Sequence, residues 1–410
     1  MASLRQDAEY IIQGAIAEVM PDKAVAAALE GKVFPGRVIL IAAGKAAWQM
    51  ANTAWQVLGD GIEKGIVITK YNHGKGAIGN LLIREAGHPT PDENGFAATA
   101  EALEMVTDLK AEDTVLFLLS GGGSALFELP LIPAEELQDI TRQLLASGAD
   151  IESINILRKR LSRVKGGKFA QCCEPAQVYS VILSDVLGDR VDVIASGPAC
   201  ADTSTAADAI AVAEKYALHL SDRAWSLLRQ ETPKVISNVT NIVNGSVKQL
   251  CAAAANCCRE LGYDTCILTE ELACEAKDAG RMLAEKLIEN AASQKPLAFI
   301  AGGETVVKLT GHGLGGRNQE LALSAALGIR GITGAAVFSV GSDGTDGPTD
   351  AAGGFVDADT ADMLESKGVR IEDALVNNDS YHALQAVDGL IMTGPTGTNV
   401  NNAAVALLRR

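Results

Sequence analysis

The sequence has 410 residues, of which 48% are hydrophobic and 21% charged, and its formal net charge is −16. A chain of this length exceeds one hydrophobic core, so we expect two domains of ordinary size. The acidic balance excludes a general nucleic-acid surface, which needs clustered lysine and arginine. No apolar run is long enough to cross a bilayer, and Asp7 and Glu9 stand where a signal peptide would be apolar. We therefore expect a cytoplasmic protein with no nucleic-acid or membrane partner.

One stretch departs from the acidic balance, since basic residues gather between Arg158 and Lys168. A pocket for an anionic ligand and a solvated helix face explain such a run about equally well. The five histidines show no ligand spacing, and no Cys-x-x-Cys pair occurs. We therefore expect no metal site built on histidine or cysteine.

The first half of the chain alternates apolar strands with helices. Strands are predicted at residues 37–42, 65–69, 114–119 and 178–183, and helices at 4–30, 45–57, 93–109, 133–161, 205–217 and 221–229. The run at 114–119 is apolar throughout, which is typical of a parallel strand buried on both faces. This alternation predicts an α/β fold, with a three-layer, Rossmann-like domain over residues 1–235.

A second α/β pattern begins at Thr240, after a boundary segment at residues 231–238. Strands are predicted near 240, 263–268, 302–303, 305–309 and 335–340, and helices at 246–261, 275–293 and from 317 onward. A polar, glycine-rich loop precedes a short apolar strand at the end. These elements predict a C-terminal α/β domain over residues 236–410, with the active site in the cleft between the two domains.

Several predicted strands end in the same kind of turn. These turns are Gly44-Lys45, Ser120 to Ser124, Ser184-Asp185, Gly311 to Arg317 and Ser342-Asp343. In open α/β sheets, ligands bind beyond the carboxyl ends of the strands. Each turn alone is ordinary loop chemistry, but five together favour one shared site for a phosphate-bearing ligand.

Two cations stand where predicted helices begin, Lys45 after Gly44 and Arg317 after Gly316. A cation at a helix N-terminus opposes the helix dipole, so it calls for an anion as compensation. The planar guanidinium of Arg317 suits two-point contact with a carboxylate or a phosphate. The alternative for both is a side chain that points into water.

Four aspartates follow predicted strands, namely Asp185, Asp189, Asp343 and Asp346. Each is a candidate for holding Mg²⁺ or for acting as a base. Their alternative role is turn formation, because Asp-Gly sequences favour turns. The spacing after Asp343 is not that of an EF-hand, so calcium binding is not expected.

Gly311, Gly313 and Gly316 satisfy the G-x-G-x-x-G outline of a dinucleotide fingerprint between a predicted strand and a predicted helix. The helix, however, begins with Arg317, whereas close packing of a helix on a sheet requires a small apolar residue at this position. In that fingerprint an acidic residue about 20 positions further on binds the ribose of the dinucleotide, and no acidic residue stands at that distance beyond Gly316. These features disfavour a nicotinamide site.

The motifs resemble the class II glycerate kinases, the glycerate 2-kinase family whose C-terminal part is called the MOFRL domain. The segments that carry the resemblance are Ser120-Gly121-Gly122-Gly123-Ser124-Ala125, Ser184-Asp185-Val186-Leu187-Gly188-Asp189, Ser196-Gly197-Pro198, Gly315-Gly316-Arg317-Asn318-Gln319-Glu320, Ser342-Asp343-Gly344-Thr345-Asp346 and Gly397-Thr398-Asn399-Val400-Asn401. The resemblance spans nearly the whole chain. It departs from the family pattern at Asn402, where aspartate is common, and at Leu187, where proline is usual.

This resemblance implies phosphorylation of D-glycerate at its 2-hydroxyl, with ATP and Mg²⁺ as cofactors and 2-phosphoglycerate and ADP as products. By motif, Lys45 and Arg317 match the basic active-site residues of the family. For phosphoryl transfer we further expect Asp185 or Asp343 to act as the Mg²⁺ ligand or as the base, so all four are candidate catalytic residues. Further residues expected to bind substrate or nucleotide are Ser120, Gly121, Gly122, Gly123, Ser124, Asp189, Gly315, Gly316, Asn318, Glu320 and Asn399. The alternatives are an NAD(P)H-dependent hydroxypyruvate reductase and a non-catalytic sugar-phosphate-binding regulator. A homodimer is compatible with the sequence, which does not fix the oligomeric state.

Overall fold

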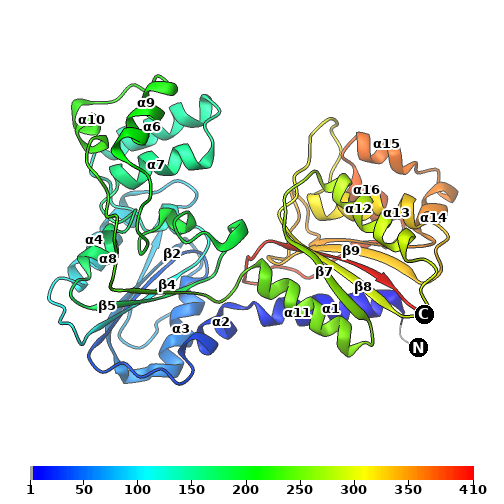
Figure 1. Ribbon diagram of the computed structural model, residues 1–410, viewed down its shortest axis with the longest axis horizontal. Coiled ribbons are helices and arrows are strands. Elements are labelled where there is room, and N and C mark those ends of the chain that lie inside the picture. Colours follow the sequence, from blue (N-terminus) through cyan, green and yellow to red (C-terminus); the bar gives the residue numbers. More distant parts are fainter. Residues whose placement is uncertain (1–2) are drawn as a thin grey trace. The chain divides into compact units, whose positions relative to one another are not determined.

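The computed structural model describes residues 3–410, which divide into two compact units, each with its own sheet (Figure 1). The N-terminal unit comprises Ala24–Asn244, and the C-terminal unit comprises Gly245–Arg410 with the segment that ends at Lys23. The units therefore differ from the domains predicted with a boundary at residue 235. Strand β6 (Val239–Val243) pairs with β5 of the first sheet, and helix α1 (Leu4–Glu18) belongs to the second unit.

The N-terminal unit is built on a six-stranded sheet in which every pair of neighbours is parallel. Its order is β3 (Leu82–Ala86), β2 (Ile62–Lys70), β1 (Val38–Ala43), β4 (Thr114–Leu119), β5 (Gln177–Ile182) and β6. This 3-2-1-4-5-6 order is that of the doubly wound dinucleotide-binding fold. It confirms the predicted Rossmann-like architecture, although β3 was not predicted.

Helices cover both faces of this sheet, because successive strand residues point to opposite sides. The helices of the unit are α2 (Pro21–Leu29), α3 (Ala47–Leu58), α4 (Glu93–Met105), α5 (Gly123–Leu126), α6 (Ala134–Ala146), α7 (Ile151–Leu161), α8 (Lys168–Cys172), α9 (Ala206–Lys215) and α10 (Asp222–Leu228), with short 3₁₀ turns η1 (Gly59–Gly61), η2 (Leu187–Asp189) and η3 (Ile194–Ser196). Ile39 and Ile41 of β1 pack with α4 and α8, whereas Leu40 packs with α2 and α3.

A separate helical group extends from this unit (Figure 1). It consists of α6, α7, α9 and α10, which share a core of their own. In the chain, α6 and α7 lie between β4 and β5, and α9 and α10 lie between β5 and β6. These helices are additions to the sheet rather than a third layer over it.

The C-terminal unit has a six-stranded mixed sheet. Its order is β11 (Leu390–Ile391), β10 (Gly353–Asp357), β9 (Ala335–Gly341), β12 (Asn402–Leu408), β8 (Leu297–Gly303) and β7 (Asp264–Leu272), and only β7 and β8 are parallel neighbours. The last strand of the chain, β12, lies in the middle and runs antiparallel to both β8 and β9. The carboxyl ends of β8 and β9 therefore lie at the same edge.

Two layers of helices flank the second sheet as well. The helices are α1, α11 (Val247–Glu260), α12 (Ala276–Glu289), α13 (Arg317–Ile329), α14 (Thr360–Ser366), α15 (Ile371–Val376) and α16 (Ser380–Ala386). Helices α12 and α13 pack on one face, and α1 and α11, which contact each other, pack on the other. Asp7 of α1 is buried where it accepts a hydrogen bond from the Tyr263 hydroxyl at 2.6 Å and pairs with Arg409 at 2.9 Å.

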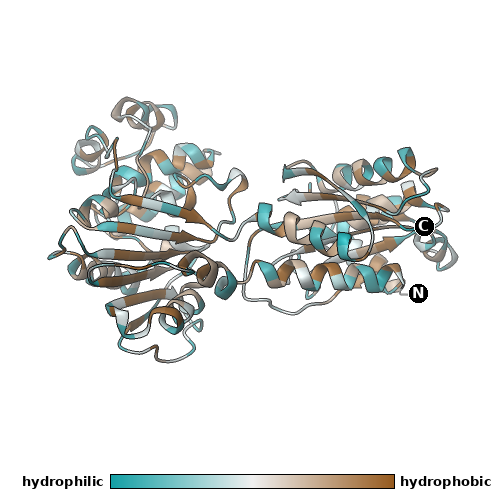
Figure 2. Ribbon diagram, turned by 60° about the horizontal axis from the view of Figure 1, so that its bottom comes forward, coloured by the Kyte–Doolittle hydropathy of each residue, from teal (hydrophilic) through white to brown (hydrophobic). Residues whose placement is uncertain are grey.

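The strands of both sheets are predominantly hydrophobic, and polar residues gather on the outer faces of the helices (Figure 2). Within residues 3–410, we find no helix that combines the length and the apolar character needed to span a membrane.

Candidate functional site

The strand order of the N-terminal unit reverses direction between β1 and β4, which are neighbours in the sheet. A crevice forms outside the carboxyl ends of the strands at such a switch point, and ligands of this fold bind there. Gly44-Lys45 follows β1, and Ser120-Gly121-Gly122 follows β4. The structure thus brings together two of the turns that the sequence analysis selected.

Hydrogen bonds lock these two turns to each other. The Lys45 amide donates to the Gly121 carbonyl at 2.9 Å, and the Ala46 amide donates to the Ser120 hydroxyl at 3.1 Å. Ser120 is 3% exposed. Its side chain therefore holds the Lys45 turn in place, a supporting position rather than an open ligand contact.

Three side chains from the loops after different strands surround Gly121 and Gly122. A Cβ atom at Gly121 would lie 2.6 Å from Asp185 Oδ2 and 3.7 Å from Lys45 Cε. At Gly122, whose φ is +89°, a Cβ atom would lie 3.0 Å from His88 Cδ2 and 3.3 Å from Lys45 Cγ. A side chain at either position would require the lysine, the carboxylate or the imidazole to shift, and the positive φ of Gly122 further favours glycine there.

Lys45 is the open cation of this cluster. It is partly exposed, and its ammonium makes no hydrogen bond or ion pair with any other residue that the structure describes. The side chain stands just before α3, whose first turn opposes a positive charge. An ammonium left without a partner in such a place is suited to receive an anionic ligand.

His88 belongs to the cluster but was not among the predicted site residues. Burial, with the nearby positive charges of Lys45, Lys70 and His73, lowers the pKa of its imidazole below the usual value. The sequence analysis overlooked it because β3, which ends two residues earlier at Ala86, was not recognised as a strand. The signal available was Gly87-His88-Pro89 directly after Leu82–Ala86.

The other predicted residues of this unit lie close by in the chain but differ in their surroundings. Gly123 and Ser124 begin the short helix α5, and the Ser124 carbonyl accepts a hydrogen bond from the Lys165 ammonium at 2.8 Å. Asp189 ends η2, on the loop after β5, with a φ of +53°. The Asp185 side chain alone is placed directly against the Gly121 turn.

The C-terminal unit gathers its own candidates at one sheet edge. Asn402 of β12 is in register with Gly303 at the end of β8 and with Gly341 at the end of β9. Glu304 and Asp343 follow these strands, and the loop containing Asn399 precedes β12. Asp343 is partly exposed, and its carboxylate accepts a hydrogen bond from the Thr345 amide at 3.1 Å.

Arg317 opens α13, as predicted, but its guanidinium already has a partner. Its Nη1 lies 2.6 Å from Oε1 of Glu304, and the two side chains are 35% and 44% exposed. One part of the planar fork is therefore held by a carboxylate while the rest remains accessible. Glu304, which the sequence analysis did not select, fixes the direction of this arginine.

The N-terminus of α13 is filled by a carboxylate of the protein itself. Asp346 accepts hydrogen bonds from the Asn318 amide at 3.1 Å and the Gln319 amide at 2.9 Å. Gly316 permits this approach, because a Cβ there would lie 2.2 Å from Asp346 Cγ. Burial raises the pKa of the Asp346 carboxyl to about 6. Of its predicted roles, the structure thus favours a structural one, as the cap of a helix.

Two predicted binding residues of α13 are buried in polar networks. The Asn318 side chain accepts from the Ser339 hydroxyl at 2.6 Å and donates to Asn402 Oδ1 at 3.2 Å. Glu320 accepts from Asn378 at 3.2 Å, and burial raises the pKa of its carboxyl. Both side chains hold neighbouring segments of the protein in place.

The predicted dinucleotide outline is not formed. Residues 305–309 are not a strand, and Leu309 is 81% exposed. Cβ atoms at Gly311 and Gly313 would clash with Asn377 and Asp379, and one at Gly315 would clash with Ser380. The glycines permit close approach, but the segment that approaches is residues 377–380 of the same chain, so no pyrophosphate can take that place.

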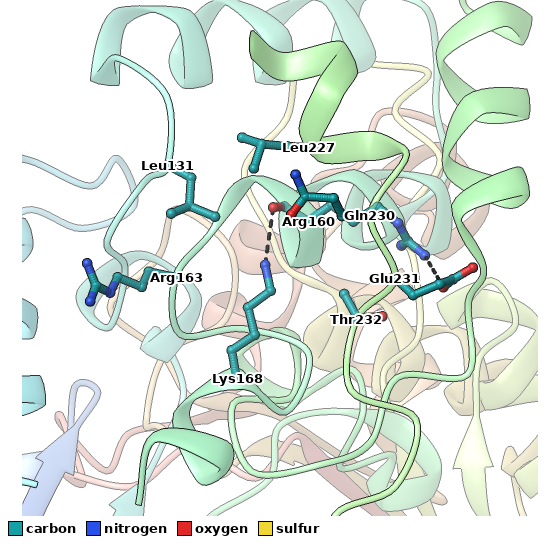
Figure 3. A pocket seen from close by; sticks show the side chains of 8 residues that line it. All are labelled: Leu131, Arg160, Arg163, Lys168, Leu227, Gln230, Glu231 and Thr232. Atoms are coloured by element: carbon teal, nitrogen blue, oxygen red, sulfur yellow. Dashed lines mark hydrogen bonds and ion pairs between the residues drawn. The ribbon is translucent and has the colours of Figure 1, made fainter. Parts of the chain in front are cut away.

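The basic run between Arg158 and Lys168 is mostly neutralised within the N-terminal unit. Lys159 pairs with Asp202 at 3.1 Å, Lys165 pairs with Glu128 at 3.3 Å, and the Lys168 ammonium donates to three backbone carbonyls around the end of α7. Burial lowers the pKa of Lys168 to about 8. Figure 3 shows the cavity of about 140 Å³ beside it, where Arg160 is directed to Glu231 at 3.6 Å. For the paired residues of this run, the structure supports neither a pocket for an anionic ligand nor a solvated helix face.

Among residues 3–410, no group of three or more His, Cys, Asp or Glu side chains gathers in a way that could hold a metal ion. Mg²⁺ is commonly held by one or two carboxylates, with substrate phosphates and water completing the coordination. The Asp185 carboxylate, set beside the unpaired Lys45, fits that mode of binding.

Comparison with known proteins gives two family matches, one in the N-terminal and one in the C-terminal part of the chain. Residues 7–229 match the family described as a domain of unknown function (DUF4147), and residues 297–402 match the MOFRL family. A D-glycerate 2-kinase of Thermotoga maritima is 52% identical over 412 residues, which covers 99% of each chain. A protein of Agrobacterium vitis named putative hydroxypyruvate reductase is 38% identical, over 91% of this chain and 100% of the relative.

Among solved structures, that of a glycerate kinase from Thermotoga maritima matches with a TM-score of 0.95 at 51% sequence identity, and the match covers 99% of both chains. The similarity in sequence and in structure thus extends over both units. This chain belongs to the glycerate 2-kinase family.

Proposed function

We propose that this protein transfers the γ-phosphoryl group of ATP to the 2-hydroxyl of D-glycerate, giving 2-phosphoglycerate and ADP. The observation that carries the proposal is the full-length similarity to a D-glycerate 2-kinase, at 52% identity. The unpaired ammonium of Lys45 beside the Gly121-Gly122 turn supports it, because phosphoryl transfer depends mainly on positioning and charge neutralisation.

In the N-terminal unit, Lys45 is assigned to the oxygens of the transferred phosphoryl group, where its charge offsets the negative charge of the transition state. Asp185 is assigned to Mg²⁺, with Gly121, Gly122 and Asp189 lining the approach to the phosphates. When bound, Mg²⁺ neutralises charge on the phosphate oxygens of the nucleotide.

In the C-terminal unit, Arg317 is assigned to the glycerate carboxylate or to the γ-phosphate. Its fork retains donors beyond the one that Glu304 takes, so it can bind an oxyanion in two-point contact. Asp343 is a second candidate for Mg²⁺ or for a base, and Gly315 and Asn399 are assigned to the surroundings of the ligand.

The second candidate function is a hydroxypyruvate reductase, the name carried by the relative from Agrobacterium vitis. That chemistry needs a nicotinamide cofactor. The G-x-G-x-x-G segment from Gly311 to Gly316 is packed against residues 377–380. The kinase proposal is therefore the better supported of the two.

One assay separates these functions. The purified protein is mixed with ATP, Mg²⁺ and D-glycerate, and ADP release and the position of the new phosphate are measured. We expect ADP release that depends on D-glycerate and stops on addition of EDTA. NADH oxidation with hydroxypyruvate but no glycerate-dependent ADP release would reject the kinase proposal. The absence of both activities would favour a non-catalytic regulator.

The same assay tests the metal assignment through Asp185→Asn and Asp343→Asn. We expect at least one of these variants to lose most of its kcat while keeping the wild-type melting temperature. Rates near the wild-type value in both would exclude both aspartates as essential Mg²⁺ ligands.

A further inference from the structure

The imidazole of His88 is the group of the N-terminal cluster to which no role has yet been given. Its ring lies against the Gly122 turn, where a Cβ atom would be 3.0 Å from Cδ2 and 3.1 Å from Nε2. The same Cβ would be 3.3 Å from Lys45 Cγ, so the ring and the lysine flank one glycine. His88 therefore occupies the crevice at the carboxyl ends of the strands, beside the cation assigned to the phosphoryl group.

Two further observations set this histidine apart from one that serves packing alone. The ring is partly exposed, so a ligand can reach it. Neither ring nitrogen forms a hydrogen bond with another residue of the described chain. A partly buried imidazole inside a folded protein usually has a partner for its polar atoms, and here both nitrogens remain available to an incoming molecule.

Burial and the basic groups around the ring favour its neutral form. The charged groups near it are Lys45 after β1, Lys70 and His73 at the end of β2 and beyond it, Asp185 at the Gly121 turn, and Asp92, whose Cγ would lie 3.0 Å from a Cβ at Gly87. Burial and the three basic groups disfavour an additional positive charge, and the pKa of His88 is lowered as a result. A neutral imidazole can accept a proton at neutral pH.

We propose that His88 is a further catalytic residue, which accepts the proton that the substrate hydroxyl loses during phosphoryl transfer. This inference rests on the proposed kinase function. As the O–H bond breaks, the hydroxyl oxygen forms the new bond to the γ-phosphorus. The bond from that phosphorus to the β,γ-bridging oxygen breaks, and its electron pair leaves with ADP. The proton passes to a ring nitrogen of His88 and then to water.

His88 suits this step better than the neighbouring carboxylate. Asp185 is assigned to Mg²⁺, and a carboxylate that binds a cation is a weaker base. An ordinary aspartate also titrates near pH 4, farther from neutrality than an imidazole. Because a base is most effective when its pKa lies near the working pH, the imidazole is the better proton acceptor.

The test compares His88→Gln and His88→Ala with a matched control, His219→Gln, which removes an exposed imidazole from the loop before α10. ADP release is measured from pH 5 to 9, with kcat and the KM values for D-glycerate and ATP determined separately. We expect His88→Gln to lower kcat by about 100-fold or more, the usual contribution of a general base, with both KM values within about 3-fold.

Two readouts distinguish proton transfer from a structural role. In the wild type and in the control, kcat/KM should fall on the acid side with a midpoint below pH 6.5, and this limb should vanish in His88→Gln. Added imidazole should restore activity to His88→Ala. Near-normal kcat in His88→Gln, a change confined to KM, or an acid limb that persists without rescue by imidazole would each overturn the inference. A wild-type protein without glycerate-dependent ADP release would instead reject the proposed function itself, and this inference with it.

Discussion

The two units treat their candidate cations differently. In the N-terminal unit, the Lys45 ammonium has no partner among residues 3–410, although it stands just before a helix whose dipole opposes it. In the C-terminal unit, Arg317 is paired with Glu304, and the carboxylate of Asp346 fills the helix N-terminus behind it. One site is thus electrostatically incomplete without a ligand, whereas the other is largely satisfied by its own chain. We therefore expect substitution of Lys45 to change mainly activity, and substitution of Asp346 to change mainly stability.

The strongest test of the site at Lys45 is Lys45→Met, which keeps a side chain of similar length and removes the charge. We expect kcat/KM for D-glycerate to fall by about 100- to 1,000-fold, because a preorganised charge at the developing anion is lost. The melting temperature should stay the same or rise slightly, since a cation at a helix start is unfavourable. Lys110→Met, on an exposed lysine, is the control. A large drop in melting temperature would show that Lys45 already has a structural partner.

Arg317→Lys tests whether the paired cation also binds substrate. Lysine keeps the charge facing Glu304 but has no fork for two-point contact. We expect kcat/KM to fall by about 30- to 1,000-fold, which corresponds to about 2–4 kcal/mol. A rise mainly in the KM for glycerate would locate the contact at the carboxylate, and a fall in kcat would locate it at the phosphoryl group. Unchanged kinetics would mean that Arg317 pairs with Glu304 but does not bind substrate.

The filled helix terminus should respond in stability. Asp346→Ala leaves the amides of Asn318 and Gln319 buried without an acceptor, so we expect the free energy of unfolding to fall by about 2–4 kcal/mol in denaturant titrations. Asp222→Ala, in the first turn of α10, removes an exposed carboxylate and should cost less than about 0.5 kcal/mol. Equal effects at the two positions would contradict the capping role.

Asp346 also gives a pH dependence with a defined sign. Burial raises the pKa of its carboxyl to about 6, above the ordinary value of 3.8. The folded state therefore holds a proton that the unfolded state has released between these values. Its contribution to stability is present below pH 3.8 and is lost as the pH rises through 6. Relative to Asp346→Asn, the wild-type free energy of unfolding should fall by up to about 3 kcal/mol across this window.

The smallest expected effect comes from Asn402, where the family commonly has aspartate. The Asn402 amide donates to the Gly303 carbonyl at 3.0 Å while its oxygen accepts from Asn318. A carboxylate could accept but not donate, so Asn402→Asp should lower the free energy of unfolding by about 1–3 kcal/mol. The measurement is a melting curve at neutral pH. A gain in stability would mean that the surrounding residues readily adapt to aspartate.

Continuous apolar runs were the easiest elements to predict. The strand at 114–119 was placed without error, because a run buried on both faces needs no partner to be recognised. Strand β3 was missed, since Arg84 and Glu85 give it the pattern of a polar loop although it pairs with β2 at the edge of the sheet. Strand β6 was predicted as a strand but assigned to the second domain, because its sequence does not reveal which sheet it joins.

The same limit applies to the candidate site. Lys45 and Asp185 were selected from turn chemistry, and the structure places both side chains against Gly121. His88 and Glu304 lie in loops, and only the fold shows that they stand beside Lys45 and Arg317, so the motifs did not single them out. Asp346 was selected for its charge, but only the fold shows that its carboxylate accepts hydrogen bonds from the amides at the start of α13.

The membership of α1 in the C-terminal unit has a consequence for synthesis on the ribosome. Helix α1 is synthesised before every strand of its unit, yet Asp7 pairs with Arg409, which follows the central strand β12. All strands of residues 24–244 are synthesised before β12, whereas Ile11 and Ile16 of α1 stay exposed to water until the unit that buries them has formed. The second sheet can therefore close only after β12 has been synthesised, long after the first helix has emerged from the ribosome.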